Sequence, residues 1–205
     1  MTTAYRGILA ALTTVSAIGA TFGVITTASA QSTPIPCTTR TTSQYFSPWG
    51  DTNPYFLVPG SDFQASDTYP WTAAGGATRV SNGDPWNVMH VASPASASIP
   101  LGGSETSMQF CVTSTETWVR FFYLSPGVTG STLHVTINVS NGTTTATNSW
   151  SQSGQLKGWQ VSPVVNLTAN YNSSDQEFIT MTANVSGSAA TWQLDDAMVD
   201  PFASL

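Results

Sequence analysis

Two stretches of the chain alternate strictly between apolar and polar side chains. From Leu133 to Val139, and again from Ile179 to Val185, every second residue is apolar and the residues between are polar. This period of two is typical of a β-strand with one buried face and one face in water. Apolar residues at helical spacing occur only before residue 31. We therefore predict an all-β structure for residues 31–205.

Other segments indicate a sandwich of two sheets. Trp118 to Leu124 is rich in aromatic residues on both faces, as expected of a central strand that is covered on both sides. Asn82-Gly83-Asp84-Pro85 is a strong turn signal. Prolines in residues 31–54 remove backbone donors, so that segment reads as an N-terminal arm. We predict a single β-sandwich domain of jelly-roll type over residues 31–205.

The first thirty residues have the pattern of a secretory signal peptide. Arg6 precedes an apolar run from Gly7 to Ile25, and Ala28-Ser29-Ala30 supplies small residues for cleavage. The alternative is an uncleaved anchor, because the run is marginally long enough to span a membrane. We expect residues 1–30 to be removed and the mature chain to be secreted, without membrane contact.

Acidic residues outnumber basic residues in a chain with few charges. There are 11 Asp and Glu residues against 5 Lys and Arg residues, and the formal net charge is −6 at pH 7. This balance argues against nucleic acid and anionic membranes as partners, because both attract basic proteins. Neutral hydroxyl and amide side chains are abundant instead. They suit a soluble exported protein, which we expect to be a monomer, and they also suit contact with sugars.

The chain contains two cysteines, Cys37 and Cys111. Exported proteins meet an oxidising environment, so we expect a disulfide that fastens the arm to the sandwich. The alternative is a reactive thiol or a metal-binding pair, but no histidine lies near either cysteine in the sequence.

Two adjacent acids, Asp195 and Asp196, interrupt a strand-like run from Thr191 to Val199. Neighbouring residues of a strand point to opposite faces, so one carboxylate must point to the buried face. A buried carboxylate needs hydrogen-bond donors, a cation, or a β-bulge that turns the pair toward solvent. We expect a cation here, and an ion pair to Arg79 or Arg120 is the alternative.

Several short motifs resemble carbohydrate-binding modules of the galactose-binding-like jelly-roll group. They are Trp192-Gln193-Leu194-Asp195-Asp196, Gly60-Ser61-Asp62-Phe63-Gln64 and the Trp71 that follows. A wider set resembles small secreted proteins of the same shape, namely Trp49-Gly50-Asp51, Tyr55 to Gly60 and Phe110 to Val112. The resemblance implies a jelly roll from Tyr55 to Val199. It also implies a calcium ion between the first and last strands, with Asp195, Asp196 and Gln64 as ligands, where Gln64 replaces an acid of that group.

Residues suited to catalysis are few. His90 and His134 are the two histidines, neither adjoins a serine in a nucleophile motif, and the Gly-x-Ser-x-Gly motif is absent. Asp195, Asp196 and Asp200 lie close in sequence, whereas the paired acids of glycosidases usually come from different strands that face one cleft. We therefore predict that the protein is not an enzyme.

Aromatic residues in expected loops are the remaining candidates for ligand contact. Sugar rings stack on exposed aromatic faces while their hydroxyls bond to polar groups alongside. We predict carbohydrate binding, to a glycan or polysaccharide, by Trp86, Trp150, Tyr171, Asn148 and Asn172. In one alternative these aromatic residues only cover the edge of the sandwich. In another the chain is a structural or protein-interaction domain with no small ligand.

Overall fold

The computed structural model describes residues 33–38, 40–92, 94–167 and 176–201. Within these ranges the regular structure is β-strand, apart from one short 3-10 helix, η1 (Ser47–Trp49). None of the described helical structure is long and apolar enough to cross a membrane. The all-β prediction is confirmed for this part of the chain. The expected signal peptide and two expected sugar contacts, Tyr171 and Asn172, lie outside the described residues.

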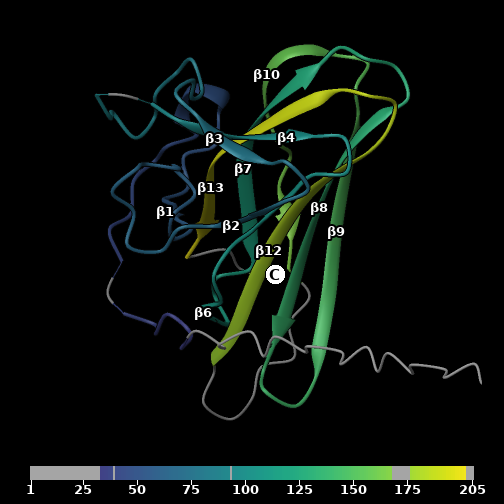
Figure 1. The fold of residues 1–205 in the computed structure, drawn as a ribbon. Coiled ribbons are helices and arrows are strands. Elements are labelled where there is room, and N and C mark those ends of the chain that lie inside the picture. Colours follow the sequence, from purple (N-terminus) through teal and green to yellow (C-terminus); the bar gives the residue numbers. More distant parts are fainter. Residues whose placement is uncertain (1–32, 39, 93, 168–175, 202–205) are drawn as a thin grey trace, which may run out of the picture. The chain divides into compact units, whose positions relative to one another are not determined.

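The strands form two antiparallel sheets (Figure 1). The first sheet has the spatial order β10 (Lys157–Val161), β7 (Trp118–Pro126), β13 (Thr191–Asp200), β4 (Ser96–Pro100) and β3 (Thr78–Val80). In the same sheet β1 (Phe56–Leu57) pairs with β13, and β11 (Val165–Asn166) pairs with β7. The second sheet has the order β2 (Thr72–Ala74), β5 (Ser104–Thr106), β12 (Gln176–Gly187), β8 (Ser131–Ser140) and β9 (Thr145–Ser153). There β6 (Phe110–Thr113) also pairs with β12.

The chain passes repeatedly between the two sheets. From β4 in the first sheet it enters β5 and β6 in the second, and it returns to the first in β7. It then runs through β8 and β9 in the second sheet, β10 and β11 in the first, β12 in the second and β13 in the first. This alternation between two antiparallel sheets is typical of a jelly roll. The predicted β-sandwich of jelly-roll type is confirmed.

The alternation in the sequence marks the faces of the sheets. Along β8 the side chains of Leu133, Val135 and Ile137 are fully buried, and the polar residues between them are partly exposed. Residues of the first sheet, including the fully buried Trp192, complete the core from the other side. Burial of this apolar surface is the dominant favourable contribution to folding.

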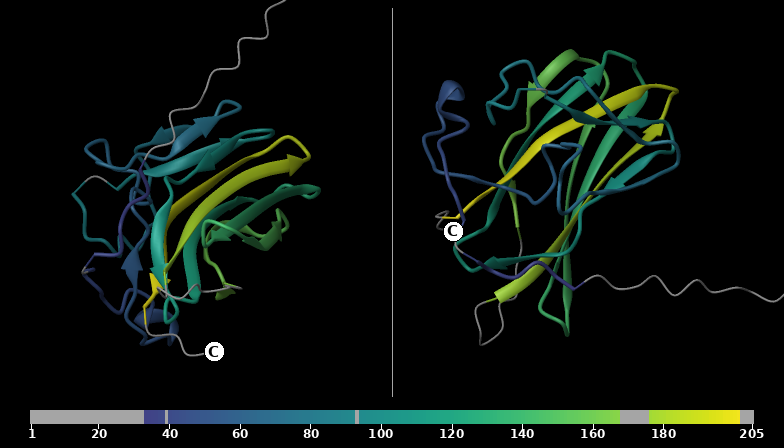
Figure 2. Two further views of the ribbon diagram at one scale, coloured as in Figure 1. Left: turned by 90° about the horizontal axis from the view of Figure 1, so that it is seen from below. Right: turned by 60° about the vertical axis from the view of Figure 1, so that its left-hand side comes forward.

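A second, smaller core lies on the other face of the first sheet. Phe122 of β7 and Met198 of β13 pack there against Phe46 of the arm, against Tyr55 just before β1 and against Val88. The rings of Phe46 and Phe122 are stacked with their centroids 5.3 Å apart. Figure 2 shows the arm on the side of β13 that is turned away from the second sheet. This second core explains why β7 is aromatic on both faces.

A disulfide joins Cys37 of the arm to Cys111 of β6, across a sequence separation of 74. The prediction of this disulfide is confirmed. Beside it the Arg40 guanidinium pairs with the Glu116 carboxylate and donates a hydrogen bond to the Cys111 carbonyl. The start of the arm is therefore held by one covalent bond and by a largely buried ion pair.

Candidate functional site

The two adjacent acids of β13 lie at a β-bulge. Asp195 pairs with Phe122 of β7, and the next paired residue, Met198, lies opposite Arg120, so β13 contains one extra residue at this point. Asp196 adopts a φ of 41° in the bulge. The two acids are only 2% and 3% exposed. A bulge was one of the expected solutions, but this one does not turn the pair toward solvent. It directs both carboxylates into one buried recess.

The recess gathers acids from three distant segments of the chain. Its lining includes Asp62 and Gln64 from the segment after β1, Asp84 from the turn after β3, and Asp195 and Asp196. Carboxylate oxygens of Asp84, Asp195 and Asp196 lie within 4.8 Å of one another. The three predicted metal ligands, Gln64, Asp195 and Asp196, therefore lie together. Asp62 and Asp84 join them, although no local pattern in the sequence linked Asp84 to β13.

Backbone amides hold two of these carboxylates in position. Asp195 Oδ2 accepts a hydrogen bond from the Asp84 amide at 2.7 Å, and Asp195 Oδ1 accepts one from the Asp196 amide at 2.9 Å. Asp84 Oδ1 accepts a hydrogen bond from the Trp86 amide at 2.8 Å. Gly83 permits this close approach, because a Cβ there would lie 2.8 Å from Asp195 Oδ2. Amide donors orient the carboxylates but do not neutralise their charge.

The acids of the recess have no cationic partner among the described residues. Burial is the main cause that raises the pKa of both Asp195 and Asp196, and the charges of neighbouring acids raise it further. The alternative expectation, an ion pair between one of these acids and Arg79 or Arg120, is not found among the described residues. Arg120 pairs with Asp51 at 2.8 Å, and Arg79 forms no ion pair with a described residue. No basic side chain described here offsets the charge of the recess, and the raised pKa values mean that the two acids retain protons more readily unless a cation is bound.

Two further features of the recess point to a ligand. One carboxylate oxygen of Asp62 is buried without a hydrogen-bond partner in the described structure, and such groups are costly. The described non-glycine residues with positive φ are Phe63, Asn87, His90 and Asp196. Asn87 and Asp196 line the recess, and Phe63 lies between two residues that do. Backbone strain of this kind costs about 1–3 kcal/mol per residue and is concentrated at functional sites.

The donor atoms of the recess suit a hard divalent cation. Carboxylate and amide oxygens are the ligands that Ca²⁺ prefers, whereas structural Zn²⁺ sites use mainly Cys and His. The Gln64 side-chain nitrogen donates to the Asp62 carbonyl at 2.8 Å, which leaves Gln64 Oε1 free to bind a cation. The residues that are present therefore fit the calcium ion that the sequence motifs imply.

Trp86 forms one wall of a groove next to this recess. Its side chain is 41% exposed, and its ring packs on Trp49 and Phe122 at centroid distances of 4.9 Å and 5.4 Å. The groove has a volume of about 340 Å³, and its other lining residues are Ser43, Gln44, Tyr45, Ser47, Pro48, Val88 and His90. Because Asp84 binds the Trp86 amide, a single turn contributes to both the recess and the groove.

Trp150 and Asn148 lie in strand β9 and not in a loop. Both are partly buried, and Trp150 packs on Phe121 and Tyr123 of β7 at centroid distances of 5.1 Å each. The expectation of a loop at Trp150 was wrong, because the polar residues around it form the exposed face of a strand. Of the predicted sugar contacts that lie within the described residues, Trp86 is therefore the one whose ring is exposed in a groove.

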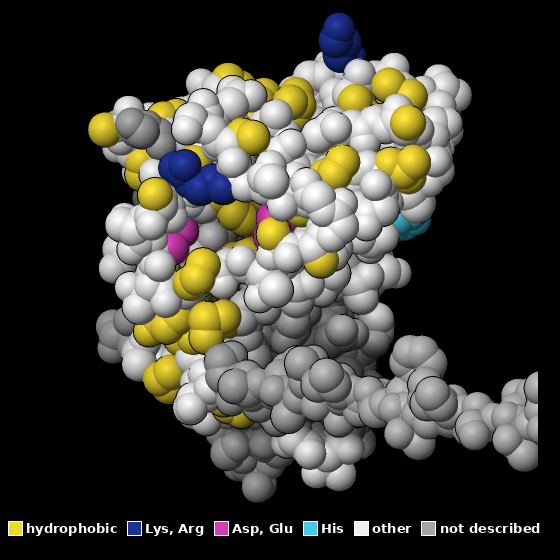
Figure 3. Space-filling view, viewed as in Figure 1, with side chains coloured by type: hydrophobic (Ala, Val, Ile, Leu, Met, Phe, Trp, Pro, Cys, Tyr) yellow, Lys and Arg dark blue, Asp and Glu magenta, His cyan; other side chains and the backbone are white. Residues whose placement is uncertain are grey.

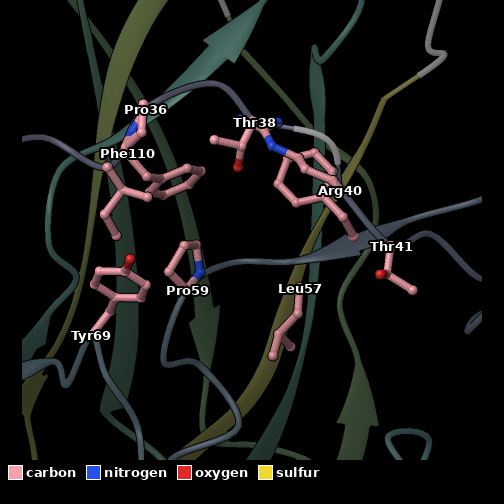
Figure 4. Close-up of a pocket in the computed structure, with 10 residues that line it drawn as sticks. Pro36, Thr38, Arg40, Thr41, Leu57, Pro59, Tyr69 and Phe110 are labelled. Carbon is pink, nitrogen blue, oxygen red and sulfur yellow. The ribbon is translucent and has the colours of Figure 1, made fainter.

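A further cavity of about 310 Å³ lies between the arm and β1 (Figure 4). Figure 4 shows Tyr69 and Pro59 on one side of this cavity and Thr38 and Arg40 on the other. Arg40 is already paired with Glu116. The cavity therefore offers mainly apolar contact and no free charge.

The two histidines do not form a catalytic arrangement with described residues. His134 lies on the outer face of the second sheet, where its ring nitrogens are 2.8 Å from the hydroxyls of Ser151 and Ser186. His90 lines the Trp86 groove. A His–Ser contact does not create a nucleophile unless a third group orients the ring, and no described acid contacts His134.

No family model matches the chain, and no curated protein matches it. Similar solved structures include carbohydrate-binding modules, the group that the sequence motifs resemble. One is a family 61 module in complex with β-1,4-galactotriose, with a TM-score of 0.42 and 16% identity over 70% of this chain and 96% of that chain. Another is a family 11 module from Clostridium thermocellum in complex with a mixed-linked tetrasaccharide, with a TM-score of 0.41 and 10% identity over 70% of this chain and 95% of that chain. An arabinose-bound α-L-arabinofuranosidase matches with a TM-score of 0.46 and 19% identity over 70% of this chain and 26% of that chain. All three TM-scores are below 0.5.

Proposed function

We propose that the protein is a secreted, non-catalytic carbohydrate-binding protein that holds a glycan in the Trp86 groove. The observation that carries this proposal is the Trp86 ring, which is exposed on one side and supported by Trp49 and Phe122 on the other. A side chain that is fixed in this way loses little conformational entropy when a sugar ring stacks on it. Gln44 and Tyr45 supply amide and hydroxyl groups alongside.

The composition of the groove favours a neutral glycan over a charged one. Its described lining contains His90 but no Asp, Glu, Lys or Arg, so a sulfated or uronic polymer would find no permanent opposite charge there. Secretion is supported by the Cys37–Cys111 disulfide, because disulfides form and persist in oxidising compartments.

Truncation of Trp86 is expected to abolish most of the glycan binding. In a pull-down with a panel of insoluble neutral polysaccharides, Trp86→Ala should bind at least about tenfold more weakly than the unmodified protein, because a stacking anchor contributes more than about 1.4 kcal/mol. Tyr69→Ala is the matched control, since Tyr69 is 38% exposed but lines the separate cavity beside the arm. Binding of the Tyr69→Ala variant to the polysaccharide should be unchanged.

Two outcomes would contradict this assignment. If Trp86→Ala is retained as well as the unmodified protein, the groove is not the binding site. If the unmodified protein is retained on no polysaccharide, with or without calcium, a structural or protein-interaction domain becomes the better interpretation.

We also propose that the acid recess binds a structural calcium ion, with Asp84, Asp195, Asp196 and Gln64 Oε1 as ligands. The ion would supply the positive charge that the described residues of the recess lack. Because Asp84 Oδ1 also accepts the Trp86 amide, an ordered recess would hold the aromatic wall of the groove in place. A site of this kind stabilises the fold and takes no part in chemistry.

Chelation of calcium is expected to lower the thermal unfolding midpoint. At a free calcium concentration one hundred times the dissociation constant, binding stabilises the native state by about 2.7 kcal/mol. Differential scanning calorimetry with calcium, with magnesium and with EDTA measures this difference. Asp196→Asn should lose the calcium response, whereas Asp51→Asn, an acid that pairs with Arg120 outside the recess, should keep it. A midpoint that is the same in calcium and in EDTA would rule out the ion.

A further inference from the structure

A small pocket opens at the edge of the sandwich, apart from the Trp86 groove. Ala73 of β2 and Glu105 of β5 come from the second sheet, Arg79 of β3 comes from the first, and the 60–71 segment supplies the other lining residues. Its volume is about 160 Å³, below the roughly 300–1,000 Å³ of sites for drug-sized ligands. The pocket thus suits a single ring or a smaller group. Figure 3 shows acidic side chains in hollows on one face of the molecule, with a basic side chain and hydrophobic side chains nearby.

Glu105 is a buried acid without a partner in this pocket. It is 3% exposed, and no hydrogen bond or ion pair with another described residue involves its carboxylate. Its register neighbours are Ala73 on β2 and Ala183 on β12, and these small side chains leave space beside the carboxylate. Burial raises the pKa of the Glu105 carboxyl to about 7, so a ligand that brings a positive charge into the pocket would stabilise the ionised carboxylate.

Aromatic side chains form another wall of the pocket. Phe63 and Trp71 line it with their ring centroids 5.4 Å apart. The Trp71 indole N–H already donates to the Pro59 carbonyl at 3.0 Å, so the ring offers the pocket its π-system and not its donor. Gly60 keeps this segment closely packed, because a Cβ at that position would lie 2.0 Å from the Tyr69 carbonyl oxygen. Aromatic faces attract organic cations.

The lining of the pocket contains more acids than bases. Asp67 is the second acid of this lining, beside Glu105. Arg79 is the basic residue of the lining, and its Nε donates to the Phe63 carbonyl, which draws the guanidinium toward the 60–71 segment. An anionic ligand would therefore meet more acids than bases, whereas a cation would find Glu105 free.

We propose that this pocket binds a small primary ammonium group, paired with the Glu105 carboxylate and packed on Trp71, on a ligand no larger than one sugar ring. The ammonium supplies the charge and the hydrogen-bond donors that Glu105 lacks. An amino sugar with a free amine is the ligand that best matches both the size of the pocket and its aromatic wall. The proposal does not depend on the Trp86 groove.

Titration with glucosamine tests the proposal at pH 7. The probe is the indole N–H resonance of Trp71, assigned with the Trp71→Phe variant. Glucosamine should shift this resonance saturably, and glucose, which has a hydroxyl in place of the amine, should bind at least about tenfold more weakly. n-Butylamine distinguishes an amino sugar from other small amines as the ligand. If n-butylamine binds more weakly than glucosamine, the pocket recognises an amino sugar. If the two bind equally, the pocket recognises any small amine. Equal affinity for glucose and glucosamine, or no shift with either amine, would overturn the proposal.

Two variants separate the charge pair from a structural role of Glu105. Glu105→Gln keeps the size of the side chain and removes its charge, so it should bind glucosamine at least about tenfold more weakly. Its unfolding midpoint should be no lower than that of the unmodified protein. Arg79→Gln removes a competing cation, so it should bind glucosamine more tightly. Unchanged binding by Glu105→Gln, or loss of binding by Arg79→Gln, would show that the pocket recognises its ligand in another way.

Discussion

Replacement of Cys37 and Cys111 by alanine is expected to lower the free energy of unfolding by about 4 kcal/mol. The disulfide spans a sequence separation of 74, so its loss returns the entropy of a long loop to the unfolded chain. The arm also covers Phe122 and Met198, and without the disulfide only non-covalent contacts would hold its start. Because small proteins are stable by about 5–15 kcal/mol, this loss would be a large part of the total.

Guanidinium unfolding followed by circular dichroism measures this loss. The double alanine variant and the reduced unmodified protein should unfold at similar, lower midpoints than the oxidised protein. A reductant should have no effect on the variant, which controls for changes unrelated to the disulfide. A variant whose unfolding free energy is within about 0.5 kcal/mol of the oxidised protein would show that the bond contributes little to stability.

Truncation of Trp192 should destabilise the fold by about 3–5 kcal/mol, the usual cost of a large aromatic-to-alanine change in a core. Trp192 has no exposed surface and lies in the main core between the sheets. Its indole N–H donates to the Ser131 hydroxyl of β8 at 2.8 Å, so this side chain in the first sheet bonds directly to the second. Trp192→Ala therefore removes a large buried area and an inter-sheet hydrogen bond together.

Two companion variants divide this effect. Trp192→Phe keeps an aromatic ring and loses the hydrogen bond, and Ser131→Ala leaves the indole N–H without its acceptor at a cost of about 1–3 kcal/mol. Both should be less destabilising than Trp192→Ala in the same denaturant titration. A loss below about 1 kcal/mol for Trp192→Ala would mean that the surrounding core collapses around the missing side chain.

The anchoring of Trp192 also bears on the candidate metal site. A strand that slips by one residue exchanges its buried and exposed faces. Trp192 and Leu194, both fully buried, fix the register of β13 against such a slip. The bulge that follows then delivers Asp195 and Asp196 to the same recess. The core of the sandwich thus determines where the two acids lie.

Several features of this protein follow from the sequence alone, because they depend on residues that are neighbours along the chain. The period of two in Leu133 to Val139 identified a strand and its buried face, and the structure confirms both. Aromatic residues on both faces of Trp118 to Leu124 identified a strand that is covered on both sides. Two cysteines behind a predicted signal peptide were enough to predict the disulfide.

The remaining features were decided by tertiary structure, because they depend on which distant segments meet. Asp84 joins Asp195 only because the turn after β3 folds against the bulge of β13, 111 positions away along the chain. Trp150 looked like a loop residue, but pairing of β9 with β8 places it in a strand against β7. No motif in the sequence singles out Glu105, yet the register of β5 with β2 and β12 buries it between small side chains. Local patterns specify the face of a strand, whereas burial and partners depend on the register and on the crossing of the chain between sheets.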